Sequence, residues 1–207
     1  MLSLETIVIF FAASVGLALS PGPDNVFVLA QSVLNGRKAG LLVTLGLCTG
    51  LLVHSAAVAF GVATVIENTE YGFLIIKLLG AAYLSYLAVQ LFKAKAMTLG
   101  QTQTADPSAK LYRRGIIMNI TNPKVAIFFL AFLPQFTDPE TGSVTIQLLV
   151  LGAVFIIATA LVFGVIAWFS GFLRERLFNS EAAQNVLNRT AAVIFVGLAV
   201  NLLLTDF

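Results

Sequence analysis

Two short polar segments, 20–25 and 119–124, contain the residues of this chain best suited to recognising a charged solute. Each contains proline and one charge: Asp24 follows Pro23 in the first, and Lys124 follows Pro123 in the second. A carboxylate attracts ammonium groups, and an ammonium group attracts carboxylates, through charge-assisted hydrogen bonds. Two opposite charges at matching positions could therefore bind a small charged or zwitterionic solute between them.

Both segments interrupt long apolar runs, and proline is the reason. Proline has no backbone N–H, so a helical carbonyl one turn earlier loses its donor. Such a break persists in lipid only where it is buried in protein or lines a cavity. At 1.5 Å per residue, the first break lies about 20 Å from the outer face and the second about 12 Å from the inner face of a ~30 Å core. The two breaks should therefore meet at nearly one depth, and such paired breaks favour a substrate site.

The remaining sequence supplies membrane helices to hold these breaks. Apolar residues make up 58% of the 207 residues and charged residues 11%, whereas an ordinary soluble domain has roughly 25% charged residues. A bilayer span needs about 20 mostly apolar residues. Five runs meet that length and a sixth is interrupted by the first polar segment: 40–65, 71–92, 115–136, 144–172 and 186–204, with 4–34 as the interrupted run.

Lys and Arg predict the orientation of these spans, because cytoplasmic loops carry an excess of both. The connections 35–39, 93–114 and 173–189 hold most of the basic residues, whereas the alternate connections hold none. Six spans with both termini on the outer side satisfy every loop. Five spans remain an alternative if 4–34 re-enters the membrane instead of crossing it, which would move the N-terminus inside.

The longest connection, 93–114, divides the chain into two halves. Its polar centre cannot bury enough apolar surface to order itself, so we expect a cytoplasmic linker between a first repeat, 1–92, and a second, 115–207. Three spans in each half make the second half enter the membrane from the opposite side. The predicted fold is an all-α polytopic membrane protein of six transmembrane helices, arranged as two inverted three-helix repeats whose first helices are broken by proline.

The two breaks and their neighbours make up the predicted site. A charge near the bilayer centre costs roughly 3 kcal/mol, so it should be paired, hydrated or functional. A substrate ammonium could meet Asp24 while its carboxylate meets Lys124 and the N-terminus of a half-helix. The alternative is structural: Asp24 caps a half-helix that begins at Asn25, and Lys124 snorkels inwards. We expect five residues to bind substrate and four to break the helices: Asp24, Asn25, Asn119, Asn122 and Lys124 for binding, and Pro21, Gly22, Pro23 and Pro123 for the breaks.

His54, the only histidine, shares a predicted packing face with three glycines. Gly46, Gly50 and His54 recur every four residues, and Gly61 continues the same face. Small residues at this spacing let helix backbones approach closely in membranes, so the imidazole should point into the bundle. There it could relay protons, which makes His54, together with Asp24, a candidate for proton coupling. The alternative is a neutral histidine that forms a hydrogen bond between helices.

Several function classes are excluded by missing patterns. The sequence has no HExxH, GxSxG or P-loop motif, so we expect no enzyme activity, and uphill transport would need an ion gradient or a partner. Metal-ligand spacings of Cys and His are absent, so we expect neither a metal nor another cofactor. No basic run could follow a phosphate backbone, so nucleic acid is not an expected partner.

Three stretches carry a family resemblance that covers essentially the whole chain. They are Leu19-Ser20-Pro21-Gly22-Pro23-Asp24-Asn25 followed by Asn35-Gly36-Arg37-Lys38-Ala39-Gly40, then Gly80-Ala81-Ala82-Tyr83-Leu84, and last Asn119-Ile120-Thr121-Asn122-Pro123-Lys124 running to Phe132-Leu133-Pro134-Gln135-Phe136. Together they resemble the LysE/RhtB family of amino-acid exporters. The resemblance implies a multi-pass carrier of the bacterial inner membrane that exports amino acids by using the proton motive force. In that membrane, the orientation that Lys and Arg predict places both termini in the periplasm.

The expected substrate is a neutral amino acid. Asp24 is the only carboxylate that we expect in the membrane core, and Lys124 can neutralise it, which disfavours a dibasic solute. Within the family that it resembles, this leaves solutes of the homoserine, threonine or leucine type. Two other functions stay open: a passive channel or facilitator for small solutes, and a membrane-embedded assembly subunit that uses the glycine face. Protons and the lipid bilayer are the other expected partners, and the chain could form a homo-oligomer.

Overall fold

The computed structural model describes residues 2–20, 22–62, 72–93, 107–170 and 180–204, and these ranges contain helices and no β-strand. Short connections join most of the helices. In chain order they are α1 (Leu4–Leu19), α2 (Pro23–Asn35), α3 (Arg37–Ala57) with a π-helical end (Val58–Val62), α5 (Gly72–Lys93), α6 (Ser108–Ile120), α7 (Pro123–Ala131), the 3-10 turns Leu133–Phe136 and Pro139–Thr141, α8 (Val144–Trp168) and α10 (Glu181–Leu204).

Two helices are long and apolar enough to cross a membrane by themselves. They are α3 with its π-helical end, Arg37–Gly61, and α8, each with 25 residues. The pairs α1–α2 and α6–α7 also qualify if each bent pair counts as one span. The described chain therefore holds two to four candidate spans, against the six that the sequence predicts.

Both bent pairs bend at the prolines that interrupt the apolar runs. The helix axes meet at 64° between α1 and α2 and at 51° between α6 and α7. The second helix of each pair begins with proline, Pro23 in α2 and Pro123 in α7. Proline suits a first helical position because its φ is already helical and no donor is needed there. Each break is therefore a helix end followed at once by a new helix start.

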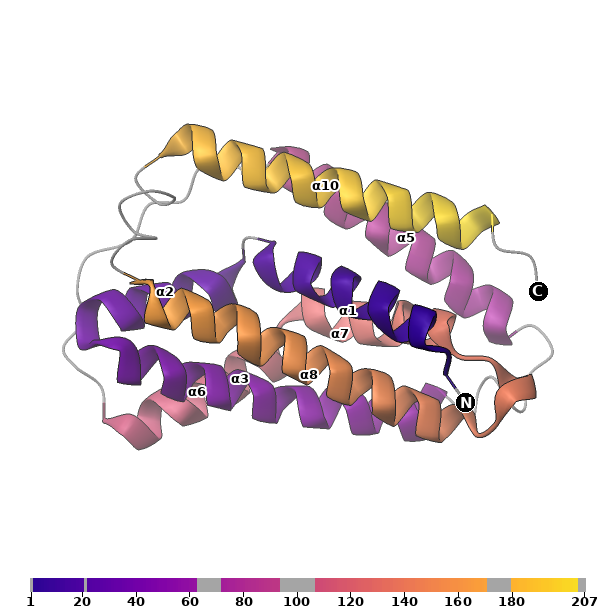
Figure 1. Cartoon of the computed structure of the whole chain (residues 1–207), viewed down its shortest axis with the longest axis horizontal. Helices are drawn as coiled ribbons and strands as arrows, with labels where there is room; N and C mark the ends of the chain where they lie inside the picture. Colours follow the sequence, from indigo (N-terminus) through magenta and orange to yellow (C-terminus); the bar gives the residue numbers. More distant parts are fainter. Residues whose placement is uncertain (1, 21, 63–71, 94–106, 171–179, 205–207) are drawn as a thin grey trace.

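The central helices of the bundle are α3 and α8. Helix α3 packs against α2, α6 and α8, and α1 packs along α8. Helices α5 and α10 lie side by side along one flank (Figure 1). The first turn of α1 and the last turn of α10 lie at one end of the bundle, whereas α2 meets α3 at the other end (Figure 1). Near that second end, the Arg37 guanidinium lies 5.0 Å from the centre of the Trp168 ring.

Helices α3 and α6 touch backbone to backbone. A Cβ atom at Gly46 would collide with the Tyr112 carbonyl oxygen, and one at Gly115 would lie 2.5 Å from the Val43 carbonyl oxygen. A Cβ at Gly50 would lie 2.7 Å from Cβ of Asn119. Glycine is needed at these positions because any side chain would push the helices apart. The contact holds the last turn of α6, and with it the second break, against α3.

Gly61 does not continue this packing face, contrary to the prediction. It is exposed, and a Cβ there would meet no described atom within 4 Å. The physical reason is the π-helical segment Val58–Val62. Its wider i→i+5 turn takes later residues off the face that a four-residue spacing defines.

Helix α6 begins before the predicted apolar run 115–136. Helix α6 starts at Ser108, inside the expected linker 93–114, while residues 94–106 lie outside the described part of the chain. Leu111, Gly115 and Asn119 are buried at four-residue spacing, so one face of this polar helix packs on α3. The run predicted to start at 186 likewise belongs to a helix that starts at Glu181.

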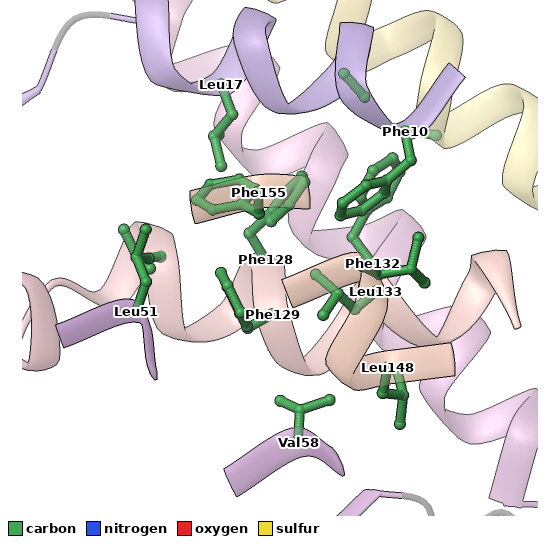
Figure 2. Packing of buried hydrophobic residues seen from close by; sticks show 14 of the residues in the cluster. Phe10, Leu17, Leu51, Val58, Phe128, Phe129, Phe132, Leu133, Leu148 and Phe155 are labelled. Atoms are coloured by element: carbon green, nitrogen blue, oxygen red, sulfur yellow. The ribbon is translucent and has the colours of Figure 1, made fainter. Parts of the chain in front are cut away.

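A cluster of phenylalanines holds α7 between α1 and α8. The Phe128 ring centre lies 6.4 Å from that of Phe10 in α1 and 5.3 Å from that of Phe155 in α8. Phe129 also packs edge-on against Phe155, at 5.0 Å. Figure 2 shows these side chains meeting between the three helices. Because close packing gains dispersion energy from many atom pairs, the cluster fixes α7 and the residues at its N-terminus.

Candidate functional site

Side chains bind the backbone carbonyls that the first break frees. Helix α1 ends at Leu19, and the next helix starts at Pro23 with Gly22 as its N-cap. The Asn25 amide donates to the Ala18 carbonyl at 2.6 Å. Lys124, which belongs to the second break, donates through its ammonium group to the Ser20 carbonyl at 3.1 Å. Pro21 lies outside the described residues.

The second break is arranged in a related way. Helix α6 ends at Ile120, and Asn122 caps α7 by accepting a hydrogen bond from the Lys124 backbone N–H at 3.0 Å. In a continuous helix, the backbone N–H of residue 123 would donate to the Asn119 carbonyl, but Pro123 has no N–H. It accepts instead from the Asn122 N–H at 3.0 Å and pairs with His54 Nε2 at 3.2 Å. A carbonyl oxygen only accepts, so His54 donates through Nε2.

A second hydrogen bond, beside the one from Lys124 to Ser20, joins the two breaks. Asn122 Nδ2 donates to Asp24 Oδ2 at 2.8 Å. Asp24 lies in the first turn of α2 and is not its N-cap, because the helix begins one residue earlier, at Pro23. Lys124 likewise points across to the first break and not along its own helix towards the inner face. Neither charge therefore takes the structural role that the alternative interpretation gave it.

Gly22 makes room for the ammonium group. A Cβ atom at Gly22 would lie 3.0 Å from Lys124 Nζ. The backbone there has φ of −171°, an extended conformation open to any residue. The constraint at Gly22 is therefore the space that Lys124 occupies, and the two breaks approach each other closely at this point.

The charges meet at a small cavity lined by both polar and apolar residues. Its volume is about 20 Å³, roughly the space of one water molecule. Its polar lining comes from both breaks and from Thr159 of α8, and its apolar lining from α1, α3, α7 and α8. The polar lining residues are Asp24, Asn119, Lys124 and Thr159, and the apolar lining residues are Leu17, Ala18, Leu51, Val125, Phe155 and Phe163.

Unsatisfied oxygen atoms concentrate at the same place. Buried polar atoms in proteins nearly always have a hydrogen-bond partner, and each one without a partner costs stability. In the described part of the chain, most of the buried side-chain atoms that lack one belong to the breaks or to the cavity lining. They are Asp24 Oδ1, Asn25 Oδ1, Asn119 Oδ1, Ser20 Oγ and Thr159 Oγ1. A ligand with donor groups would satisfy them.

The structure brings most of the predicted site residues together. Asp24, Asn25, Asn119 and Asn122 are all buried, with at most 5% of each residue exposed. Pro23 and Pro123 face outwards, so they shape the breaks without lining the cavity. His54 reaches the site only through the Asn119 carbonyl.

Sequence reasoning missed Thr159. No motif marks this residue, which stands alone among apolar residues in the middle of α8. The only available signal was that isolated hydroxyl within a strongly apolar run.

Metal-ligand clusters and other depressions in the surface could also mark a functional site. No group of three or more His, Cys, Asp or Glu side chains in those ranges could hold a metal ion. A larger, open depression of about 720 Å³ lies on α6 and includes Lys110, Arg113 and Arg114. It contains none of the predicted site residues.

Comparisons with known proteins agree with the motifs. The family described as "LysE type translocator" matches residues 15–206. The leucine efflux protein of Salmonella typhimurium is 29% identical over 195 residues, which cover 93% of this chain and 92% of that protein. The homoserine/homoserine lactone efflux protein of the same organism is 34% identical over 157 residues, 74% of each chain. An uncharacterized membrane protein of Bacillus subtilis is 28% identical over 95% of this chain and 98% of its own. No solved structure matches.

Proposed function

Because the chain belongs to the LysE type translocator family, we propose that it is a secondary transporter that exports neutral amino acids from the cytoplasm. The observation that carries this proposal is the meeting of Asp24 and Lys124, from the two helix breaks, at one buried cavity. Two relatives, matched over 92% and 74% of their own lengths, are named for the efflux of leucine and of homoserine and homoserine lactone, which supports an amino-acid substrate.

The polar lining of the cavity suits the two charged groups that all amino acids share. The substrate ammonium group would bind Asp24 Oδ1 and Asn119 Oδ1, both of which lack a partner. The substrate carboxylate would bind the Lys124 ammonium group, which has donors beyond the one given to Ser20. The positive N-terminal ends of α2 and α7 would favour the same carboxylate.

The rest of the cavity supports a neutral side chain. Asp24 is the only buried carboxylate among the residues whose burial the structure describes. A second cation on the substrate would therefore have no anionic partner there, and an isolated charge is expensive in a membrane interior. Leu51, Phe155 and Phe163 also line the cavity, and an aliphatic side chain packed against them would displace no polar contact.

Transport by this site requires a change of conformation. The cavity holds about 20 Å³, whereas pockets for small molecules usually span several hundred. We take this structure as a closed state, and we propose that the proline breaks act as hinges. Two inverted repeats, 1–92 and 115–207, would then open the site alternately to each side. Two features support this repeat arrangement. Each proposed repeat begins with a bent helix pair, α1–α2 or α6–α7. The next helix of each repeat packs on the bent pair of the other, α3 on α6 and α8 on α1.

Proton coupling would act through competition at Asp24. A deprotonated Asp24 would bind the substrate ammonium group on the cytoplasmic side. A proton arriving from the outer side would neutralise the carboxylate, release the substrate and return with the carrier. His54 is the second proton-coupling candidate, because its ring bonds to a carbonyl at the second break. The proposed orientation places both termini in the periplasm of a bacterial inner membrane, supported by the common end at which α1 starts and α10 stops (Figure 1).

Efflux from proteoliposomes tests the proposal. The purified protein would be reconstituted, loaded with labelled leucine, threonine, lysine or glutamate, and followed with and without an imposed proton gradient. Gradient-dependent efflux of the neutral amino acids, but not of lysine, is the expected result. Gradient-independent flux would indicate a channel or facilitator, and activity only with an added partner would indicate an assembly subunit.

A further inference from the structure

Thr159 presents a buried hydroxyl without a partner at the substrate cavity. The residue is 3% exposed, and its Oγ1 forms no hydrogen bond. Threonine and serine in helices commonly donate to the carbonyl four residues earlier, as Thr44 and Ser55 do in α3. Thr159 departs from that habit although it lies in a regular helix. Its hydroxyl is therefore available to a ligand in the cavity that it lines.

The neighbours of Thr159 identify which part of a substrate would reach it. Phe155 and Phe163 lie one turn before and one turn after it on α8, and all three line the cavity. This wall offers apolar surface with a single hydroxyl in it. The charged residues of the cavity come instead from α2 and α7. With the amino and carboxylate groups held there, the side chain of a bound amino acid would point towards α8.

We infer that Thr159 is a specificity residue that contacts the substrate side chain through a hydrogen bond to a side-chain hydroxyl. The inference rests on the proposed function and extends it: the carrier accepts hydroxylated amino acids and favours them over aliphatic ones of the same shape. An aliphatic side chain would fit the phenylalanine wall but leave Thr159 Oγ1 unpaired. Sites that pair a substrate hydroxyl discriminate against analogues that lack it for this reason.

Threonine and valine make the most exact solute pair for the test, since they differ by a hydroxyl in place of a methyl group. Proteoliposomes would be loaded with both amino acids, each with its own label, and the ratio of their efflux rates measured. The variants are Thr159→Val, which removes the hydroxyl at constant shape, and Thr159→Ser, which keeps it. A ratio of rates from one preparation is independent of the amount of active protein.

The wild type should export threonine faster than valine. Thr159→Val should lower the threonine-to-valine ratio about fivefold, the effect expected for one neutral hydrogen bond, while Thr159→Ser should keep it within about twofold of the wild type. If Thr159→Val does not reconstitute, Thr159→Ala removes the same hydroxyl and the same ratio is compared.

Two results would overturn the inference while leaving the proposed function intact: an unchanged ratio in Thr159→Val, whether or not both rates fall, or wild-type efflux of valine at least as fast as that of threonine. If the wild type exported no amino acid at all, the proposed function itself would fail.

Discussion

The side chain of Asn122 binds Asp24 and so links the two helix breaks. Its Nδ2 donates to Asp24 Oδ2 at 2.8 Å while its Oδ1 caps α7 by accepting from the Lys124 N–H at 3.0 Å. The residue that caps α7 therefore also orients the carboxylate on α2. The other carboxylate oxygen, Oδ1, has no hydrogen-bond partner, and it is the atom that we propose binds the substrate.

Asn122→Asp should abolish efflux while the protein still folds. The new carboxylate keeps the acceptor that caps α7, but it replaces the donor to Asp24 with a like charge, which costs several kcal/mol at close range. We expect at least a 100-fold loss of leucine efflux in proteoliposomes. Asn122→Ser is the matched control: it keeps a capping oxygen without adding charge and should retain more activity. Equal activity of Asn122→Asp and the wild type would show that the bond to Asp24 has no role in transport.

Gly22→Ala should weaken substrate affinity without unfolding the protein. The added Cβ would lie 3.0 Å from Lys124 Nζ, the flexible end of a long side chain that can move. The backbone at Gly22 is extended, so the substitution adds no conformational strain. We expect KM for efflux to rise severalfold, with the thermal unfolding temperature nearly unchanged. A large fall in that temperature instead would assign Gly22 a packing role.

The breaks were predictable from sequence because their causes are local. A proline within an apolar run ends a helix wherever the run lies, and an Asn before Pro123 is a natural cap. The bond from Asn122 to Asp24 was not predictable, since it joins residues 98 positions apart. Thr159 was missed for the same reason: its importance comes from what α8 packs against.

Gly46→Ala should destabilise the protein, and Gly61→Ala should not. A Cβ at Gly46 would collide with the backbone of α6, which cannot move aside as a side chain could. Overpacking of this kind typically costs about 1–3 kcal/mol, whereas substitutions at exposed sites usually stay within about 0.5 kcal/mol. Thermal unfolding of both variants in detergent provides the comparison. Similar unfolding temperatures for the two would contradict the close contact between α3 and α6.

Gly46 and Gly61 also show that four-residue spacing predicts a packing face only within a regular α-helix. Four-residue spacing predicts a common face as long as the helix stays regular, and Gly46 and Gly50 lie in the regular part of α3. Gly61 follows the switch to a π-helix at Val58, which no residue pattern in 58–62 announces. Hydropathy placed the start of α6 too late. The first turns of this amphipathic helix are too polar to be recognised as part of an apolar run.

His54→Gln should separate hydrogen bonding from proton transfer. Glutamine still offers an N–H donor for the Asn119 carbonyl, which His54 now meets at 3.2 Å, but it cannot bind and release a proton. We expect exchange of labelled for unlabelled leucine to continue, while the acceleration of efflux by an imposed pH gradient falls. His54→Leu, which lacks the donor as well, should impair both. Full gradient dependence in His54→Gln would limit His54 to its structural bond.

Leucine binding to the purified protein, wild type against Asp24→Asn, tests whether the two helix breaks form the substrate site. Asparagine has the shape of aspartate, so the cavity and its lining stay as they are and only the charge is lost. If the paired breaks form the substrate site, Kd should rise about 10- to 100-fold, the loss expected for a hydrogen bond between charged groups. An unchanged Kd in a folded Asp24→Asn protein would show that the substrate binds away from the breaks.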